Sequence, residues 1–168
     1  MMTIAEKLGD SVVMGNLSHI VNYERGGIGM VGKMPWIIKN NPDGTIPLNE
    51  IEYATSIVLN EHVTPITGIS LESSQNNCSG QVLRLDYISK VKKIAKKAKA
   101  KLHLDGARSW NASLFLGIEM KEMVKDFDLV SVCLSKGLGC PIGSLVVGSE
   151  KDIKVARNYR KILGGAMR

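Results

Sequence analysis

The sequence lacks any apolar run that could cross a membrane, since such a span needs about 20 consecutive apolar residues. Its first ten residues, MMTIAEKLGD, also lack the apolar core of a signal peptide. Cysteine is scarce, and Cys78, Cys133 and Cys140 neither show a metal-binding spacing nor can all pair with one another. We therefore expect a cytoplasmic protein with reduced thiols, no membrane partner and no metal ion.

Acidic residues are missing from one lysine-rich segment. Residues 90–101 hold seven lysines and no acid, so subtracting those seven from the net charge of +6 leaves −1 for the rest of the chain. No aromatic residues alternate with these lysines to stack on bases, so we expect no nucleic-acid partner. Apolar residues recur here at helical spacing, which predicts an amphipathic helix with its lysines in solvent. These residues are Tyr87, Ile88, Val91, Ile94, Ala95 and Ala98.

The chain of 168 residues is long enough for one domain with a sizeable core. Strand and helix patterns alternate along it, which favours an α/β fold with a mostly parallel sheet flanked by helices. A turn is predicted at 41–45. The predicted strands are 11–15, 27–32, 65–73, 100–105, 128–135 and 142–149, and the predicted helices are 48–59, the lysine-rich segment, 107–117 and 150–163.

Three polar residues lie at the carboxyl ends of predicted strands: Glu72, Asp105 and Lys136. In open α/β sheets this edge forms the ligand crevice. Lys136 follows the apolar segment 130–134, and burial there would favour the uncharged, nucleophilic amine that Schiff-base chemistry needs. The alternative interpretation is a lysine at the end of a strand that extends into water.

The motif HLDGAR, residues 103–108, places an acid at the end of a strand and an arginine three positions later. A carboxylate beside a pyridine nitrogen keeps that nitrogen protonated, and pyridoxal phosphate requires such a carboxylate together with a lysine. The alternative is that Asp105 caps a helix and Arg108 lies in solvent. His19, shortly after the first predicted strand, could stack on a cofactor ring, transfer a proton or be purely structural.

Several segments together resemble the low-specificity threonine aldolases, which are pyridoxal-phosphate enzymes of the aspartate aminotransferase fold (fold type I). Their order and spacing agree with the family from near Gly9 to Arg168. The combination of HLDGAR, SKGLG and LGGAMR is specific to this family among pyridoxal-phosphate enzymes. The matching segments are GNLSHIVNYERGG, LESSQNNCSGQVL, HLDGARSWNA, SVCLSKGLGCPIGSLVVGS and RKILGGAMR.

The resemblance implies a role for each candidate residue in binding pyridoxal 5'-phosphate. Lys136 would form the Schiff base, Asp105 would pair with the pyridine nitrogen, and His19 would stack over the ring. Arg108 would contact the ring hydroxyl or the substrate carboxylate, and Arg168 would reach the cofactor or substrate across a subunit contact. The implied reaction is retro-aldol cleavage of a β-hydroxy-α-amino acid, threonine or allo-threonine, to glycine and acetaldehyde. The implied assembly of the full-length form is a homo-oligomer, either a dimer or a tetramer.

The chain also departs from the family pattern. The family's phosphate-binding loop would precede Met1 and its smaller C-terminal domain would follow Arg168, so we expect residues 1–168 to be a partial large domain. Gln75 stands where the family has a histidine proposed to act at the substrate hydroxyl, and glutamine cannot act as a base near neutral pH. Two alternatives stay open. One is another fold-type-I lyase such as a β-eliminating lyase, against which LGGAMR argues, and the other is a non-catalytic chain that pairs with a full-length homologue.

Overall fold

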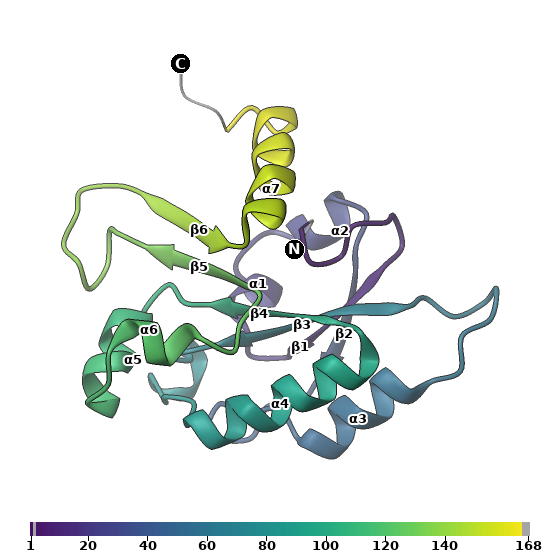
Figure 1. The fold of residues 1–168 in the computed structure, drawn as a ribbon, viewed down its shortest axis with the longest axis horizontal. Coiled ribbons are helices and arrows are strands. Elements are labelled where there is room, and N and C mark those ends of the chain that lie inside the picture. The colour runs from purple at the N-terminus through teal and green to yellow at the C-terminus, as the bar shows by residue number, and fades with distance from the viewer. Residues whose placement is uncertain (2, 166–168) are drawn as a thin grey trace.

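The computed structural model describes residue 1 and residues 3–165, which form a six-stranded sheet with helices packed against it (Figure 1). The strand order is β2-β1-β3-β4-β5-β6. Strands β1 to β5 all run parallel to one another, and the edge strand β6 runs antiparallel to β5. The predicted α/β class with a mostly parallel sheet is confirmed. The strands are β1 (Ser11–Gly15), β2 (Met34–Ile38), β3 (Ile66–Glu72), β4 (Lys101–Asp105), β5 (Leu129–Cys133) and β6 (Ser144–Gly148).

Short helices connect these strands. None of the helices in the described part of the chain is long and apolar enough to span a membrane. The bounds are α1 (His19–Asn22), α2 (Gly27–Met30), α3 (Leu48–Ser56), α4 (Leu85–Ala98), α5 (Ser109–Leu116), α6 (Met120–Val124) and α7 (Glu150–Ile162), with a 3-10 turn η1 (Asn76–Cys78) after β3.

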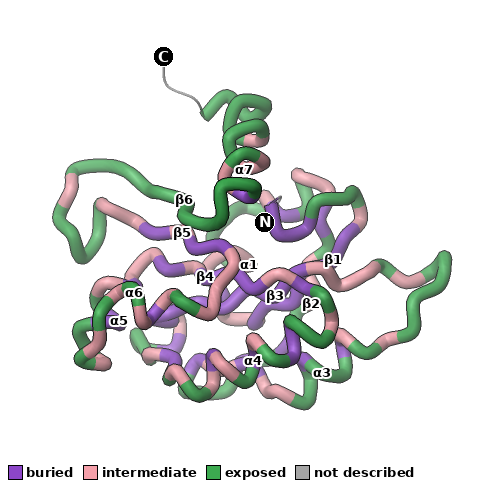
Figure 2. The backbone as a smooth tube through the Cα atoms, in the orientation of Figure 1, coloured by how far each residue is buried: buried purple, intermediate pink, exposed green. Residues whose placement is uncertain are grey.

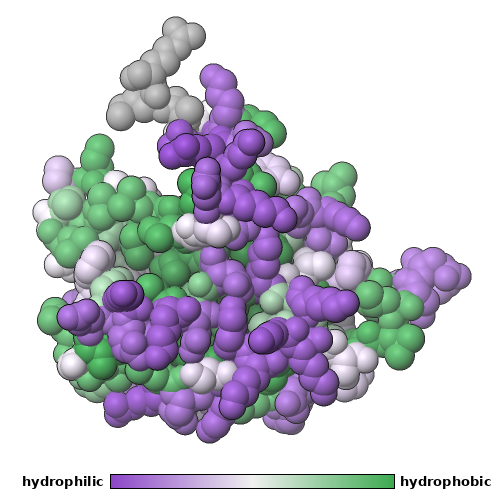
Figure 3. Space-filling view, in the orientation of Figure 1, coloured by the Kyte–Doolittle hydropathy of each residue, from purple (hydrophilic) through white to green (hydrophobic). Residues whose placement is uncertain are grey.

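The larger core lies between the sheet and the helices α3 and α4 (Figures 1 and 2). Helix α4 buries Ile88, Val91 and Ile94 in this core, and most of its lysines are exposed. Figure 3 shows hydrophilic side chains gathered over α4. The lysine-rich segment is therefore the amphipathic helix that its spacing predicts, because the apolar residues fall on one side of a 3.6-residue turn.

The opposite face of the sheet is covered less completely. A smaller cluster there joins the N-terminal segment to β1 and α2, with Ile4, Val12 and Ile28 buried. Ile153 of α7 packs against the same cluster. Strand β6 is exposed along its whole length (Figure 2). Hydrophobic surface lies beside the β5–β6 hairpin (Figure 3). Apolar side chains are therefore exposed at this end of the sheet.

The predicted strand at 27–32 is wrong, because residues 27–30 form the short helix α2. Gly26 and Gly32, on either side of it, have positive φ angles of 73° and 72°, a conformation that extended strands do not use. The sequence analysis also missed β2, which contains Pro35. A proline is tolerated there because β2 is an edge strand of the described sheet and pairs only with β1.

Candidate active site

The strand order creates a reversal point beside β1. The chain moves from β1 outward to β2 and then returns to β3 on the other side of β1. In open α/β sheets, ligands bind beyond the carboxyl ends of the strands at such a point. His19 begins α1 just after β1, and Glu72 is the last residue of β3. The His19 backbone amide donates a hydrogen bond to Glu72 Oε2 at 2.7 Å, which ties the two sides of this point together.

Three polar residues lie side by side on neighbouring strands at this edge of the sheet. Glu72 of β3 is in register with Asp105 of β4, and Asp105 is in register with Ser131 of β5. The turn after Asp105 is held against β5, because the Gly106 amide donates to the Ser131 carbonyl at 2.8 Å. A Cβ atom at Gly106 would lie 3.0 Å from that carbonyl oxygen, so glycine permits the close approach.

The Asp105 carboxyl is held in a largely desolvated position at this edge. Burial raises its pKa above the ordinary value, while a hydrogen bond from the Ala107 amide, at 3.2 Å from Oδ1, acts in the opposite direction. The positive charges of His19, Lys136 and Arg108 also favour its ionised form. Asp105 is therefore a half-buried acid near three cationic groups, and it does not serve as a side-chain cap of α5.

Lys136 lies in the turn three residues after the end of β5. The expectation that it is buried at the end of the strand is wrong, because the strand stops at Cys133 and Lys136 is exposed. Its Nζ lies 3.1 Å from Cys133 Sγ. The following Gly137 lets the loop pack on α5, since a Cβ atom there would clash with Asn111 Oδ1.

One cavity of about 230 Å³ joins the candidate side chains (residues from α1, β4, β5 and the loops after them). Four of the five predicted site residues line it, and the fifth, Arg168, lies outside the described residues. A larger hollow of about 740 Å³ beside β2 and α3 contains none of them, so chemistry rather than size identifies the site. The lining residues are His19, Ile20, Glu24, Asp105, Ala107, Arg108, Ser131, Val132, Cys133, Lys136 and Ser144.

Several side chains of this cavity were not predicted from the sequence. Glu24 Oε1 lies 3.0 Å from His19 Nδ1, so the acid orients the imidazole. Ser131 and Cys133 are two positions apart on β5 and both line the cavity. Strand alternation places residues two apart on the same face, and this period within 128–135 could have identified the pair.

His103 of β4 is buried and contacts both neighbouring strands. Its Nδ1 lies 2.9 Å from Ser70 Oγ on β3, and its Nε2 lies 3.3 Å from Ser131 Oγ on β5. Burial, with a smaller contribution from the positive N-terminus, lowers the pKa of His103 to about 3. The ring is therefore neutral near pH 7 and helps to fix the Ser131 hydroxyl that lines the site.

Gln75 is almost fully buried and does not line this cavity. Its Oε1 accepts from the Cys78 amide at 2.8 Å, and its Nε2 donates to the Leu17 carbonyl at 2.8 Å. Both ends of the amide are thus engaged by the backbone. This arrangement assigns Gln75 a structural role in the segment that follows β3.

The six-stranded, mostly parallel sheet matches solved structures of fold-type-I pyridoxal-phosphate enzymes over part of their length. One of them, a threonine aldolase from Leishmania major, has a TM-score of 0.81, with 20% identity, and the match covers 96% of this chain and 47% of that one. The beta-eliminating lyase family model matches residues 1–168, and the chain belongs to this family.

Within that family, the chain is homologous to low-specificity threonine aldolases. It is 47% identical over 97% of its length to a probable low-specificity L-threonine aldolase 2 of Arabidopsis thaliana, and covers 46% of that protein. It is 37% identical over 95% of its length to the low specificity L-threonine aldolase of Escherichia coli, and covers 47% of it. The chain therefore spans less than half the length of these curated relatives.

Proposed function

We propose that this chain binds pyridoxal 5'-phosphate through Lys136 and forms part of an enzyme that cleaves threonine or allo-threonine to glycine and acetaldehyde. The observation that carries the proposal is the single cavity lined by His19, Asp105, Arg108 and Lys136. An amine, a buried carboxylate, an imidazole and a guanidinium suit an aldehyde, a pyridine nitrogen, a flat ring and an anionic oxygen, respectively. The residues present therefore fit the cofactor that the homologous enzymes use.

Each of these residues has a distinct task. When bound, pyridoxal phosphate supplies an electron sink beside the substrate α-carbon. Lys136 binds the aldehyde, and Asp105 holds a proton on the ring nitrogen, because a nearby carboxylate favours the protonated base. His19 covers the ring face and is positioned through its backbone by Glu72 and through Nδ1 by Glu24. Arg108 binds an anionic oxygen of the cofactor or the substrate.

The second candidate function is cofactor binding without aldol cleavage. The Gln75 amide cannot take a proton near neutral pH, and both of its polar ends are engaged by the backbone. A chain of this kind would pair with a full-length homologue, whereas the full-length form of the aldolase would act as a homo-oligomer.

The test of the cofactor site is to titrate the purified chain with pyridoxal phosphate, reduce it with borohydride and map the pyridoxyl label. The label is expected on Lys136 and should be lost in Lys136→Gln. Lys154→Gln, on the exposed part of α7, should keep it. A label on Lys161 or on the lysines of α4, with Lys136 unmodified, would refute the assignment.

Glycine release distinguishes the two functions. The cofactor-loaded chain, without borohydride reduction, is assayed with threonine and with allo-threonine, and a separate portion is reduced to map the label. Release that disappears in Lys136→Gln supports the aldolase, because no other described residue is proposed to bind the aldehyde. Labelling of Lys136 without any glycine release supports cofactor binding alone.

A further inference from the structure

The proposed cofactor lysine contacts a thiol that the proposed reaction does not use. Lys136 Nζ donates a hydrogen bond to Cys133 Sγ at 3.1 Å. Both residues line the 230 Å³ cavity, with Cys133 half-buried and Lys136 exposed. Small solutes that enter the cavity therefore reach a sulfur atom that already has an amine beside it.

Backbone hydrogen bonds hold this pair together. The Leu134 amide donates to the Gly143 carbonyl at 2.9 Å, the Cys140 amide donates to the Leu134 carbonyl at 3.0 Å, and the Gly139 amide donates to the Lys136 carbonyl at 3.0 Å. The loop after β5 is thus folded back on itself around the pair. Reacting atoms held at roughly 3–3.5 Å gain a large advantage over the same groups free in solution.

We propose that Cys133 and Lys136 form an oxidisable pair that closes into a covalent sulfur–nitrogen bond when the protein meets a peroxide. Hydrogen peroxide oxidises the Cys133 thiol to a sulfenic acid and is itself reduced to water. The nitrogen of the Lys136 amine then attacks the sulfur, the S–OH bond breaks, and hydroxide leaves with a proton from nitrogen as a second water. The thiol is the group oxidised, the net loss from the protein is two hydrogen atoms, and two equivalents of a thiol reductant reverse the bond.

The lysine amine is better placed to react with the oxidised sulfur than a backbone nitrogen or a second thiol, the two groups with which a sulfenic acid often condenses. The nearest following amide, that of Leu134, is engaged with the Gly143 carbonyl. The Cys78 thiol is buried and faces the Asn41 carbonyl. Cys140 is the competing thiol in the same loop, so it must be removed in the test.

The consequence for activity rests on the proposed function. If Lys136 binds the cofactor aldehyde, its bond to Cys133 removes the amine that the aldehyde needs. Oxidation then blocks cofactor loading, and bound cofactor in turn protects Lys136 from the crosslink. A peroxide therefore switches off cofactor loading reversibly.

The experiment treats the purified, cofactor-free chain with hydrogen peroxide and compares intact and tryptic masses before and after a thiol reductant. Trypsin separates residues 126–136 from 137–151 only when Lys136 is a free amine. The expected product is one peptide, 126–151, lighter by two hydrogen atoms and restored by the reductant. It should form in Cys140→Ser as in the wild type, and be absent from Cys140→Ser when Cys133→Ser or Lys136→Gln is added.

Two results would overturn the proposal. One is a loss of two hydrogen atoms that leaves Lys136 cleavable and disappears in Cys140→Ser, which would identify a Cys133–Cys140 disulfide. The other is survival of the product in Cys140→Ser/Lys136→Gln, which would identify a backbone nitrogen as the partner. Because the crosslink is measured without cofactor, it stands or falls separately from the proposed function. Prior loading with pyridoxal phosphate should lower the yield of the crosslink several-fold. If borohydride mapping of a separate portion shows the cofactor on Lys136 and the crosslink yield is still unchanged, bound cofactor does not protect Lys136.

Discussion

At the scale of single residues, two acids at the carboxyl edge of the sheet, Glu72 and Asp105, are partly removed from water. Burial raises the pKa of Glu72, and the neighbouring Asp105 charge raises it further against the backbone hydrogen bonds that it accepts. Burial raises the pKa of Asp105 in the same way. When the folded pKa exceeds the unfolded one, stability falls as pH rises through the interval between the two values. Near neutral pH these carboxylates therefore cost folding free energy, which is typical of functional sites.

Replacing the Asp105 carboxyl should separate stability from function. Asp105→Asn keeps an oxygen for the Ala107 amide but removes the buried charge, so the free energy of unfolding at pH 7 should rise by roughly 0.5–2 kcal/mol. Cofactor binding should weaken, since an amide cannot hold the ring-nitrogen proton by charge. Urea denaturation and cofactor titration measure the two effects. Glu52→Gln, an exposed acid on α3, is the control and should change neither.

His103 should impose the opposite pH dependence. Its folded pKa of about 3 lies below the unfolded value near 6.5, so the unfolded chain takes up the proton first and stability falls as pH drops through this interval. In His103→Gln this loss should disappear, changing the slope by up to about 1.4 kcal/mol per pH unit. Urea denaturation between about pH 7 and pH 5 measures it. Parallel curves for the two proteins would contradict the assignment, whereas the exposed His62→Gln should give parallel curves.

Motifs predicted that His19, Asp105, Arg108 and Lys136 belong to one site because each carries a reactive group near a recognisable strand end, and all four line one cavity. They did not reveal Ser131 and Cys133, whose importance comes from register with a neighbouring strand. The burial expected for Lys136 failed because hydropathy along the chain does not show where β5 leaves the sheet. The proximity of these residues was therefore predictable from the sequence, whereas the burial and contacts of each residue depended on tertiary structure.

At the scale of elements, periodicity was reliable where one face is buried and the other is charged. Helix α4 is the example, with its apolar positions in the larger core. Glycine-rich and proline-containing segments gave the errors at α2 and β2, since local pattern there is weak and edge pairing decides the structure. Two other short helices, α1 and α6, were also missed, because four or five residues are too few to show a period.

The two faces of α4 should respond differently to truncation. Ile88 is 1% exposed in the core, so Ile88→Ala should lower the free energy of unfolding by about 2–5 kcal/mol through lost burial and an unfilled cavity. Lys93 on the exposed face is the matched control, and Lys93→Ala should change it by less than about 0.5 kcal/mol. Equal effects in thermal or urea unfolding would mean that α4 does not pack as described.

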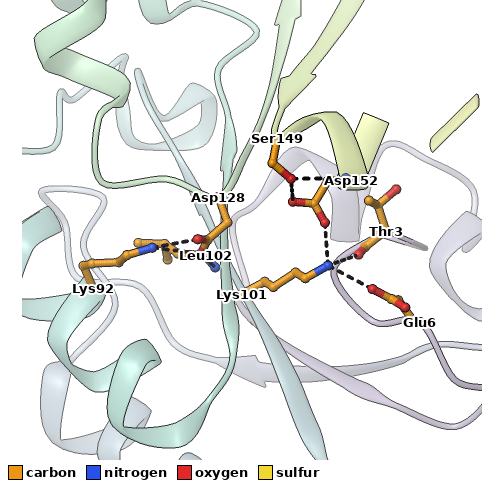
Figure 4. A network of polar contacts seen from close by, with 8 residues as sticks. All are labelled: Thr3, Glu6, Lys92, Lys101, Leu102, Asp128, Ser149 and Asp152. Atoms are coloured by element: carbon orange, nitrogen blue, oxygen red, sulfur yellow. Dashed lines mark hydrogen bonds and ion pairs between the residues drawn. The ribbon is translucent and has the colours of Figure 1, made fainter. Parts of the chain in front are cut away.

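At the scale of the whole molecule, the strand order β2-β1-β3-β4-β5-β6 brings distant segments together in a way that no local pattern encodes. Lys101, at the start of β4, makes polar contacts with segments that are distant in the sequence (Figure 4). Its Nζ contacts the Thr3 carbonyl at 3.1 Å, Glu6 at 2.9 Å and Asp152 at 2.6 Å. One side chain thus joins the N-terminal segment, the sheet and the first turn of α7.

Loss of Lys101 should loosen all three parts together. Burial favours the neutral acid at Asp152, but hydrogen bonds from Lys101 and Ser149 outweigh it and hold the pKa of this carboxyl below its usual range. Lys101→Met would leave that carboxylate without its cation, and the free energy of unfolding at pH 7 should fall by about 1–3 kcal/mol. Lys90→Met is the matched control, because the Lys90–Asp86 pair is exposed and its loss should cost less than about 1 kcal/mol.

The pH dependence of the Lys101 effect identifies its cause. Asp152 has a folded pKa below its unfolded one, so its contribution is present above the unfolded value and is lost as pH falls through the folded value. The difference between wild type and Lys101→Met should therefore shrink in acid. Adding Asp152→Asn should recover part of the loss, since the amide needs no counter-ion. A deficit that is equal at every pH, and that Asp152→Asn does not reduce, would show that the lysine acts through packing of its aliphatic chain instead.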